Sequence, residues 1–170
     1  VPYNDTPVNV VAGSSGTLSI LGSRTTGVNT FPGAITLAHD LTIGAGDAGA
    51  TSAALTLSGG VTGTGNLDIN YSATALTGGV TFSTNALNMA GTITNRGNTT
   101  GTLTISSVIG SAVTSITENS ATSPLTLSGA NTAFTGTVNL TAGTLNIRDA
   151  NALGATGSGG LFTRSEERRV

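Results

Sequence analysis

The only histidine of the chain, His39, is followed directly by an acid, Asp40. A histidine and a carboxylate are two of the three groups of a serine-hydrolase site, and the third is a serine nucleophile placed by the fold. No G-x-S-x-G segment occurs, and serine is too frequent here for one to stand out. A metal site is not indicated, because a lone histidine in a chain without cysteine lacks partner ligands. We therefore predict that His39 and Asp40 lie in a solvent-facing turn.

Six carboxylates precede the C-terminal tail, and their spacing bears on glycan-cleaving chemistry. They are Asp5, Asp40, Asp47, Asp68, Glu118 and Asp149. Glycosidases use paired carboxylates, and β-helical enzymes that cleave polysaccharides gather several acids with Arg or Lys on one face. Asp40 and Asp68 are 28 residues apart, and Asp47 and Asp68 are 21 apart, so some could face each other across one turn of a coil. No arginine is expected in register with them, so a lyase or glycosidase site is kept only as an alternative.

The segment Gly44-Ala45-Gly46-Asp47-Ala48-Gly49 matches the G-x-G-x-x-G pattern of dinucleotide-binding loops. That pattern requires a helix directly afterwards, whose N-terminus holds the pyrophosphate, and here another strand follows. One copy with one aspartate also cannot build the stacked calcium ladder of Gly/Asp nonapeptide repeats. The sequence thus predicts no catalytic, cofactor-binding or metal-binding residues and no enzymatic activity.

Threonine pairs at Thr92–Thr94 and Thr102–Thr104, with a related Thr17–Ser19, suggest a third kind of surface chemistry. Flat threonine arrays on a β-helix can order water and bind ice. Such an array needs a regular register over many turns, whereas the spacing here varies by several residues per turn. Ordinary outward strand residues are the preferred interpretation, and an ice- or surface-binding face is kept as an alternative.

The composition indicates the kind of fold that must position these residues. The 170 residues include 32 Thr and 25 Gly, and only 8% are charged, against about 25% in ordinary globular domains. Disordered chains usually combine low hydrophobicity with high net charge, whereas this chain is 37% hydrophobic with a net charge of −2. We expect an all-β fold with a surface of Thr, Ser and Asn, because β-branched threonine packs well in strands.

Short alternations of apolar and polar residues, separated by Gly, Asn, Ser or Pro, predict many short strands and no helix. The predicted strands are Thr17–Leu21, Ile35–Leu37, Leu41–Ile43, Ala54–Leu57, Leu67–Ile69, Val80–Phe82, Leu87–Met89, Thr92–Thr94, Leu103–Ile105, Val113–Ile116, Leu125–Leu127, Thr137–Leu140 and Thr144–Ile147. Two interleaved series of apolar residues share a period of 20 to 26 residues. The first is Leu18, Leu41, Leu67, Ile93, Ile116 and Val138, and the second is Leu55, Val80, Leu103, Leu125 and Leu145.

This period predicts a parallel β-helix (solenoid) of roughly seven turns of about 20–26 residues, in which each strand pairs with its equivalents one turn before and after. Inward Leu, Ile and Val would stack into ladders along the axis, and Gly and Asn would form the corners. A β-sandwich is the competing architecture, since it also uses many short strands. It would show antiparallel hairpins without a shared period.

The stretch Leu125–Gly154 is the clearest repeat and carries a family resemblance. Its Leu125–Gly129, Phe134–Leu140, Gly143–Ile147 and Asn151–Gly154 parts resemble the autotransporter-associated β-strand repeat, which closes on Asn-Ala-Leu-Gly. The resemblance implies a right-handed parallel β-helix in the passenger region of a large secreted or surface-displayed bacterial protein. It brings no catalytic residues with it. The expectation is a structural stalk or adhesin-like segment.

Partners and location follow mainly from this resemblance. It implies an extracellular or cell-surface location, host or environmental surface ligands (protein or glycan), neighbouring β-helix turns, and a C-terminal membrane barrel in the full-length protein. Nucleic acid is not expected as a partner, because the pI of about 5.0 leaves no basic stripe to neutralise phosphates. No apolar run approaches the roughly 18 residues of a membrane-spanning helix.

The chain divides into an irregular N-terminal edge (1–13), a repeat region (14–163) and a charged tail (164–170). The N-terminal edge could supply an edge strand or part of a turn. The tail resembles a translated adapter and is expected to be non-native or loosely attached. The chain begins with Val, so a processed protein or an excised fragment is expected. A solenoid cut from a longer protein exposes unpaired strand edges, so this chain is expected to self-associate.

Overall fold

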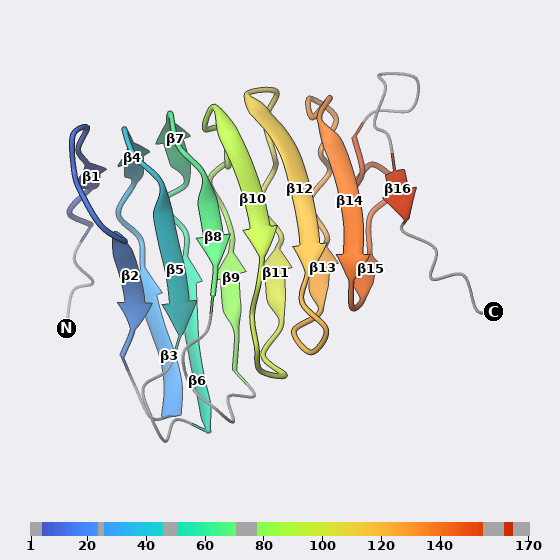
Figure 1. Cartoon of the computed structure of the whole chain (residues 1–170), viewed down its shortest axis with the longest axis horizontal. Helices are drawn as coiled ribbons and strands as arrows, with labels where there is room; N and C mark the ends of the chain where they lie inside the picture. The colour runs from blue at the N-terminus through green and yellow to red at the C-terminus, as the bar shows by residue number, and fades with distance from the viewer. Residues whose placement is uncertain (1–4, 24–25, 46–50, 71–77, 155–161, 165–170) are drawn as a thin grey trace.

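A computed structural model describes residues 5–23, 26–45, 51–70, 78–154 and 162–164. Residues 162–164 are described by their backbone only. Throughout these ranges the chain is all-β and contains no helix, so none that is long and apolar enough to cross a membrane. Figure 1 shows the strands side by side along the long axis of the molecule, with the N- and C-terminal ends at opposite ends of the row. The predicted all-β fold class is confirmed.

The strands form three parallel sheets, here called A, B and C. Sheet A contains β1 (Val8–Val10), β4 (Ile35–Leu37) and β7 (Val61–Gly63). Sheet B contains β2 (Ser19–Gly22), β5 (Leu41–Ala45), β8 (Leu67–Ile69), β10 (Gly91–Asn95), β12 (Val113–Asn119), β14 (Thr137–Ala142) and β16 (Phe162–Arg164). Sheet C contains β3 (Thr26–Phe31), β6 (Ser52–Leu57), β9 (Val80–Phe82), β11 (Leu103–Ile105), β13 (Leu125–Leu127) and β15 (Leu145–Ile147).

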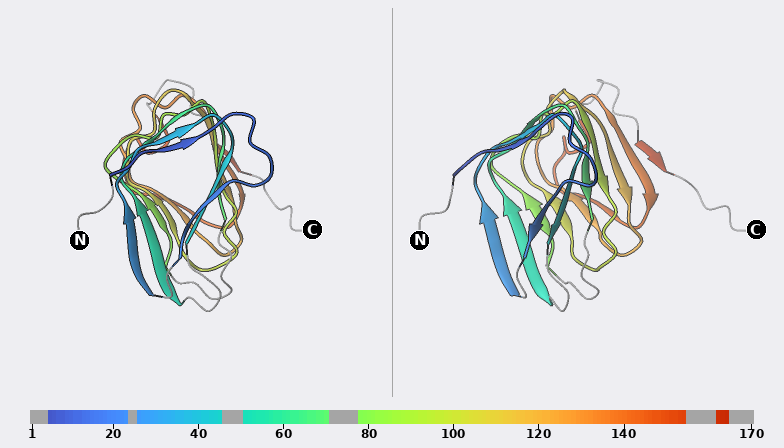
Figure 2. Two further views of the ribbon diagram at one scale, coloured as in Figure 1. Left: turned by 90° about the vertical axis from the view of Figure 1, so that its left-hand side faces the viewer. Right: turned by 60° about the vertical axis from the view of Figure 1, so that its left-hand side comes forward.

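The order of strands in each sheet identifies a β-solenoid. Neighbours within a sheet are separated in sequence by strands of the other sheets, and every described pairing is parallel. In the view along the axis, the sheets surround one common interior (Figure 2). A β-sandwich with antiparallel hairpins is therefore wrong for this chain. The handedness and the number of complete turns stay predictions.

The interior is built from the two apolar series that the sequence indicates. In sheet B, Leu41 pairs with Leu67, Leu67 with Ile93, Ile93 with Ile116, and Ile116 with Val138. In sheet C, Leu55, Val80, Leu103, Leu125 and Leu145 pair in the same consecutive way. All but Leu145 are buried. A one-residue slip would turn every such side chain outward, so burial fixes the register even though turn lengths vary.

The third side of the solenoid changes as the turns shorten. Sheet A ends at β7. Beyond it, the described residues on this side pair only through isolated bridges, which join Leu87 to Val61 and to Ile109, and Thr64 to Ala90. The predicted strand Leu87–Met89 is therefore wrong as a strand, although Leu87 and Met89 are both buried.

The described strands β3 and β7 are not among the predicted ones. Each contains a glycine with positive φ, Gly27 at 83° and Gly63 at 90°. Glycine in this conformation is typical of turns. A Cβ at Gly63 would lie 2.1 Å from the Leu37 carbonyl oxygen, so the close approach of two turns explains this glycine.

Both ends of the chain contribute edge strands. β1 lies within the segment 1–13 and pairs only with β4. At the other end, β16 pairs with β14, and its last residue is Arg164. Residues 165–170 lie outside the described part, and the expectation of a non-native tail stays a prediction.

The repeat-like stretch Leu125–Gly154 is held to its neighbours by a buried asparagine. The Oδ1 atom of Asn131 accepts from the Ile109 amide at 2.8 Å, and its Nδ2 donates to the Ala152 carbonyl at 2.7 Å. One side chain thus joins the corners of three consecutive turns. Phe134, three residues later, is fully buried and helps to fill the interior.

Candidate functional site

A polar groove of about 560 Å³ lies on the outward face of sheet B, over β5, β8 and β10. Its lining includes His39, Asp40, Asp68 and Arg96. Three of these are residues whose chemistry the sequence singles out, although they lie up to 29 positions apart in the chain. The solenoid brings them together because the equivalent positions of consecutive turns are neighbours in space.

The floor of the groove is an outward ladder of small polar residues. Thr42 pairs with Asp68, and Asp68 pairs with Thr94. The neighbouring positions of the same ladder are Ser19 and Thr117. Asp68 is therefore an acid in a ladder that otherwise carries hydroxyl groups along this stretch.

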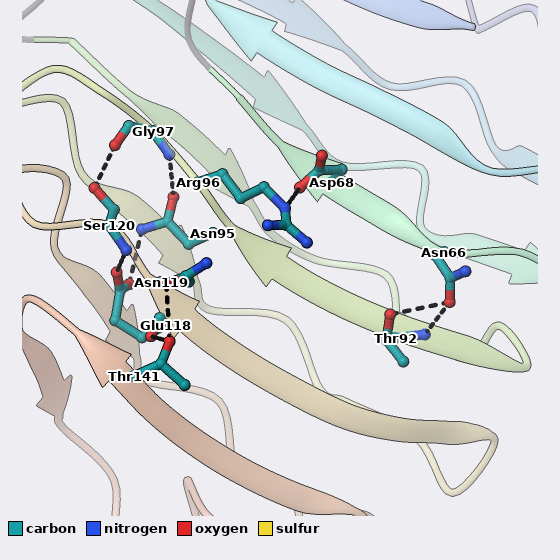
Figure 3. A network of polar contacts seen from close by, with 10 residues as sticks. All are labelled: Asn66, Asp68, Thr92, Asn95, Arg96, Gly97, Glu118, Asn119, Ser120 and Thr141. Atoms are coloured by element: carbon teal, nitrogen blue, oxygen red, sulfur yellow. Dashed lines mark hydrogen bonds and ion pairs between the residues drawn. The ribbon is translucent and has the colours of Figure 1, made fainter. Parts of the chain in front are cut away.

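Arg96 supplies the cation that faces this acid. Its Nε atom lies 2.9 Å from Asp68 Oδ1, and the two side chains are 53% and 39% exposed (Figure 3). The expectation that no arginine would be in register is wrong for Asp68. Arg96 follows Thr94 by two residues, which places both side chains on the same outward face of the strand.

A second ladder borders the groove where its strands begin. The Asn66 amide and its Nδ2 donate to Asp40 Oδ1 at 2.8 and 3.0 Å. One turn later, the Thr92 amide and hydroxyl donate to Asn66 Oδ1, each at 2.9 Å (Figure 3). These bonds hold Asp40 and Asn66 in fixed orientations. They also join three consecutive turns through side chains.

His39 does not form a catalytic relay in this arrangement. Its Nδ1 atom lies 3.3 Å from the carbonyl oxygen of Asp40, a backbone atom of the adjacent residue. Asp40 is exposed and directs its carboxylate to Asn66 instead. The predicted solvent-facing turn at His39 and Asp40 is consistent with these contacts.

The other acids that the structure describes do not line the groove. Asp5 is exposed, and Asp149 accepts from the Asn151 amide at 2.8 Å within a turn. Asp47 and most of the Gly44–Gly49 segment lie outside the described residues. Within the described ranges, no three His, Cys, Asp or Glu side chains gather as metal ligands would.

Comparisons with known proteins were made for the whole chain. No family model, curated protein or solved structure matches it. The resemblance of Leu125–Gly154 to the autotransporter-associated repeat therefore stays an expectation from the sequence, and the geometry must carry the functional argument.

Sequence reasoning missed one buried polar site inside the solenoid. Asn95 pairs with Ile69 and with Glu118, and Glu118 pairs with Leu140, so an amide and an acid interrupt an inward apolar ladder of sheet B. Asn95 and Glu118 are both fully buried. The alternation in β10 and β12 could have revealed them, because each stands two residues after an inward isoleucine, Ile93 or Ile116.

Hydrogen bonds satisfy this buried carboxyl group. Asn95 Nδ2 donates to Glu118 Oε2 at 2.7 Å, and the Ser120 amide donates to Oε1 at 2.7 Å (Figure 3). Asn95 Nδ2 also donates to the Ser123 carbonyl at 2.8 Å, and the Ser120 hydroxyl donates to the Gly97 carbonyl. The cluster thus links the corners of two consecutive turns.

Burial raises the pKa of Glu118 from 4.5 to about 7, and the hydrogen bonds from Asn95 and Ser120 oppose that rise. Desolvation dominates because the charged form loses its water while only two donors replace it. A fully buried carboxyl group cannot touch a substrate on the surface. Glu118 can instead make the stability of this part of the solenoid depend on pH.

Proposed function

We propose that this chain is a rigid stalk, an adhesin-like segment of a secreted or surface-displayed bacterial protein, with no chemistry of its own. The observation that carries the proposal is the continuous parallel pairing of the inward apolar residues in sheets B and C. Their inward ladders continue from turn to turn although the turns differ in length.

Such ladders favour a stiff rod. Each turn contacts mainly the turns before and after it, so the interior is continuous along the axis. Seven strands at 4.8 Å separations extend sheet B over about 29 Å. Outward hydroxyl and amide groups stack at this separation without the repulsion that a ladder of like charges would produce. Length could then be added by repeating turns.

Rigidity can be measured directly on the purified chain. Thr30 and Asn146 occupy the two ends of one outward ladder of sheet C, five strand separations apart, or about 24 Å. Spin labels on Thr30→Cys and Asn146→Cys should give one narrow distance distribution by double electron–electron resonance. A distribution as broad as that of an unstructured linker would contradict the stalk. Release of reducing ends from polysaccharides would contradict the absence of chemistry.

The location and partners belong to the same proposal. The repeat-like stretch Leu125–Gly154 supports export to the cell surface, with host or environmental surfaces as the contact partners of the stalk. Fractionation of cells that produce the full-length protein tests this directly. External protease should remove the epitope of this region from intact cells. Recovery of the epitope only from the cell interior would contradict the location.

A second candidate function is supported by a different face. Thr30, Thr56, Thr81 and Thr104 form one outward ladder of sheet C with no register shift, and the ladder continues to Thr126, which is buried. Threonines of consecutive turns are therefore in register although the turns vary in length, because the corners absorb the differences. We propose as an alternative that this hydroxyl ladder contacts an ordered hydroxyl-rich surface such as ice.

Inhibition of ice recrystallisation tests this alternative. Thr81→Tyr would disrupt the ladder of sheet C, and Thr94→Tyr on the outward face of sheet B is its matched control. The alternative predicts that the unaltered chain and the Thr94→Tyr variant inhibit recrystallisation and that the Thr81→Tyr variant does not. Equal growth of ice grains with and without the unaltered chain would contradict it.

A further inference from the structure

We propose that the groove on sheet B binds a neutral, extended oligosaccharide, which lies along the solenoid axis across consecutive turns. This inference rests on the proposed adhesin-like function and gives it a ligand class. The oligosaccharide would lie on the outward face of β5, β8 and β10, between Arg96 and the ladder of Asp40, Asn66 and Thr92.

The first argument is the placement of charge. Only 8% of the chain is charged, yet Asp40, Asp68 and Arg96 all line this one groove. Neighbouring positions of the same outward ladder hold Ser19, Thr42, Thr94 and Thr117, which keep the strands paired without any charge. The pairing of these strands therefore does not require the ion pair between Asp68 and Arg96. A role in binding a ligand accounts for its presence.

The second argument is the supply of hydrogen-bonding groups. Arg96 uses Nε toward Asp68, and Figure 3 shows its two other nitrogens directed away from that carboxylate. A guanidinium carries five N–H donors, so most remain for a ligand. The carboxylates of Asp40 and Asp68 and the hydroxyls of Thr42 and Thr94 add acceptors beside these donors. Vicinal sugar hydroxyls, which both donate and accept, match this alternation.

The third argument is the repeat along the axis. The groove reaches from the segment before β2 to β10, which is three strand separations or about 14 Å. A pyranose unit in an extended polysaccharide advances by a distance similar to one strand separation. Consecutive sugars can therefore meet equivalent positions of consecutive turns. Asp40 and Asn66 are already fixed by their mutual bonds, so less side-chain freedom is lost on binding.

The same features disfavour the other extended polymers. Asp68 is neutralised by Arg96, and Asp40 leaves the groove with excess negative charge, which opposes uronates, sulfated glycans and nucleic acids. A peptide that adds a strand needs an open sheet edge. The central strands β5, β8 and β10 are instead paired on both sides.

The experiment titrates the isotope-labelled chain with cellohexaose, xylohexaose and mannohexaose, with hexagalacturonate as the anionic comparison, and follows amide shifts by nuclear magnetic resonance. An array of neutral oligosaccharides extends the set. We expect saturable binding of at least one neutral glycan, with shifts at Thr42, Asn66, Asp68 and Thr94. Arg96→Ala should weaken it about tenfold, the loss of one or two net hydrogen bonds.

The decisive pair of variants is Thr94→Tyr and Thr104→Tyr, which place the same bulky side chain at outward positions of β10 and β11. Thr94→Tyr should abolish binding and Thr104→Tyr should leave it within twofold, both with cooperative unfolding retained. Three results would overturn the inference: no neutral glycan binds, the anionic glycan binds most tightly, or Thr94→Tyr binds as the unaltered chain does. A narrow spin-label distance together with any of these results would leave the stalk intact and remove only the glycan site.

Discussion

Sheets B and C share one architecture but differ in regularity. From β6 to β15, each three-residue core of sheet C places one Thr or Asn between two apolar residues, and no register shift occurs. These apolar residues are buried except Leu145 and Ile147 of the last strand. Sheet B has register shifts at Gly91/Thr92 and Glu118/Asn119. It also carries the buried Asn95–Glu118 pair on its inner side and the Asp68–Arg96 pair on its outer side.

The difference separates what the fold needs from what is added to it. Sheet C shows that apolar ladders with hydroxyl groups outside are sufficient to keep consecutive turns in register. The polar exceptions of sheet B must therefore be explained by something other than strand pairing. The buried pair makes stability depend on pH, and the exposed pair offers polar groups to a ligand. Variants of the two sheets can test this division.

The largest effect is expected for the regular ladder. Leu103→Ala removes a fully buried side chain from the middle of sheet C and should lower the free energy of unfolding by about 2–5 kcal/mol. Thr104→Ala, the adjacent outward residue, should change it by about 0.5 kcal/mol. Urea unfolding followed by circular dichroism measures both. Equal effects of the two variants would mean that the inward ladder is not the main source of stability.

The buried acid of sheet B should produce a pH dependence. Because the folded pKa of Glu118, about 7, lies above its ordinary value of 4.5, the folded protein retains a proton that the unfolded chain has released between these values. Its contribution to stability is therefore complete below pH 4.5, falls as pH rises to about 7, and is constant above that. Between these pH values the free energy of unfolding should fall by about 3 kcal/mol.

Glu118→Gln is the control for this dependence, because it keeps the shape and cannot titrate. Unfolding in urea at intervals from pH 4.5 to 8 should give a falling free energy for the unaltered chain. The variant should have a nearly flat profile over the same range. A falling profile that persists in Glu118→Gln would assign the effect to other groups.

Removal of the amide partner should have a somewhat smaller effect. Asn95→Leu deletes the bonds to Glu118 and to the Ser123 carbonyl and should cost about 1–3 kcal/mol, more at pH 8 than at pH 5. Adding Glu118→Leu removes the buried carboxylate, so the double variant should be more stable at pH 8 than Asn95→Leu alone. Thermal unfolding at the two pH values measures this order. The reverse order would contradict the role of charge burial.

The ladders could be predicted from the sequence because they depend on one physical rule. Each turn must supply apolar residues at the inward positions, and this rule predicts both series. From Leu41 to Val138 and from Leu55 to Leu145 the structure has the predicted register. Leu18, the first residue of the first series, precedes β2 and is half-buried. Corners do not obey the rule. Strands β3 and β7, which contain positive-φ glycines, are therefore not among the predicted strands.

The partners within the groove and within the buried pair could not be predicted in the same way, since each contact joins side chains of different turns. Arg96 reaches Asp68 only because one turn is 26 residues long here and Arg96 lies two residues further on. Turn length varies along the chain, so sequence spacing alone did not reveal this partner. The alternation of β12 indicates an inward Glu118, but its contact with Asn95 follows from the register of β12 beside β10.

The smallest effect is expected for the exposed pair of sheet B. Asp68→Asn, Arg96→Ala and the double variant form a double-mutant cycle, whose coupling energy should be about 0.2–1 kcal/mol and should fall as salt increases. Both side chains keep substantial contact with water, which screens their attraction. A coupling energy above this range would mean that the pair joins β8 and β10 as a structural element. A small coupling energy together with weaker glycan binding by the variants would mean that the Asp68–Arg96 pair serves recognition. Sheet B would then carry a ligand-binding pair that the fold does not need, whereas sheet C carries none.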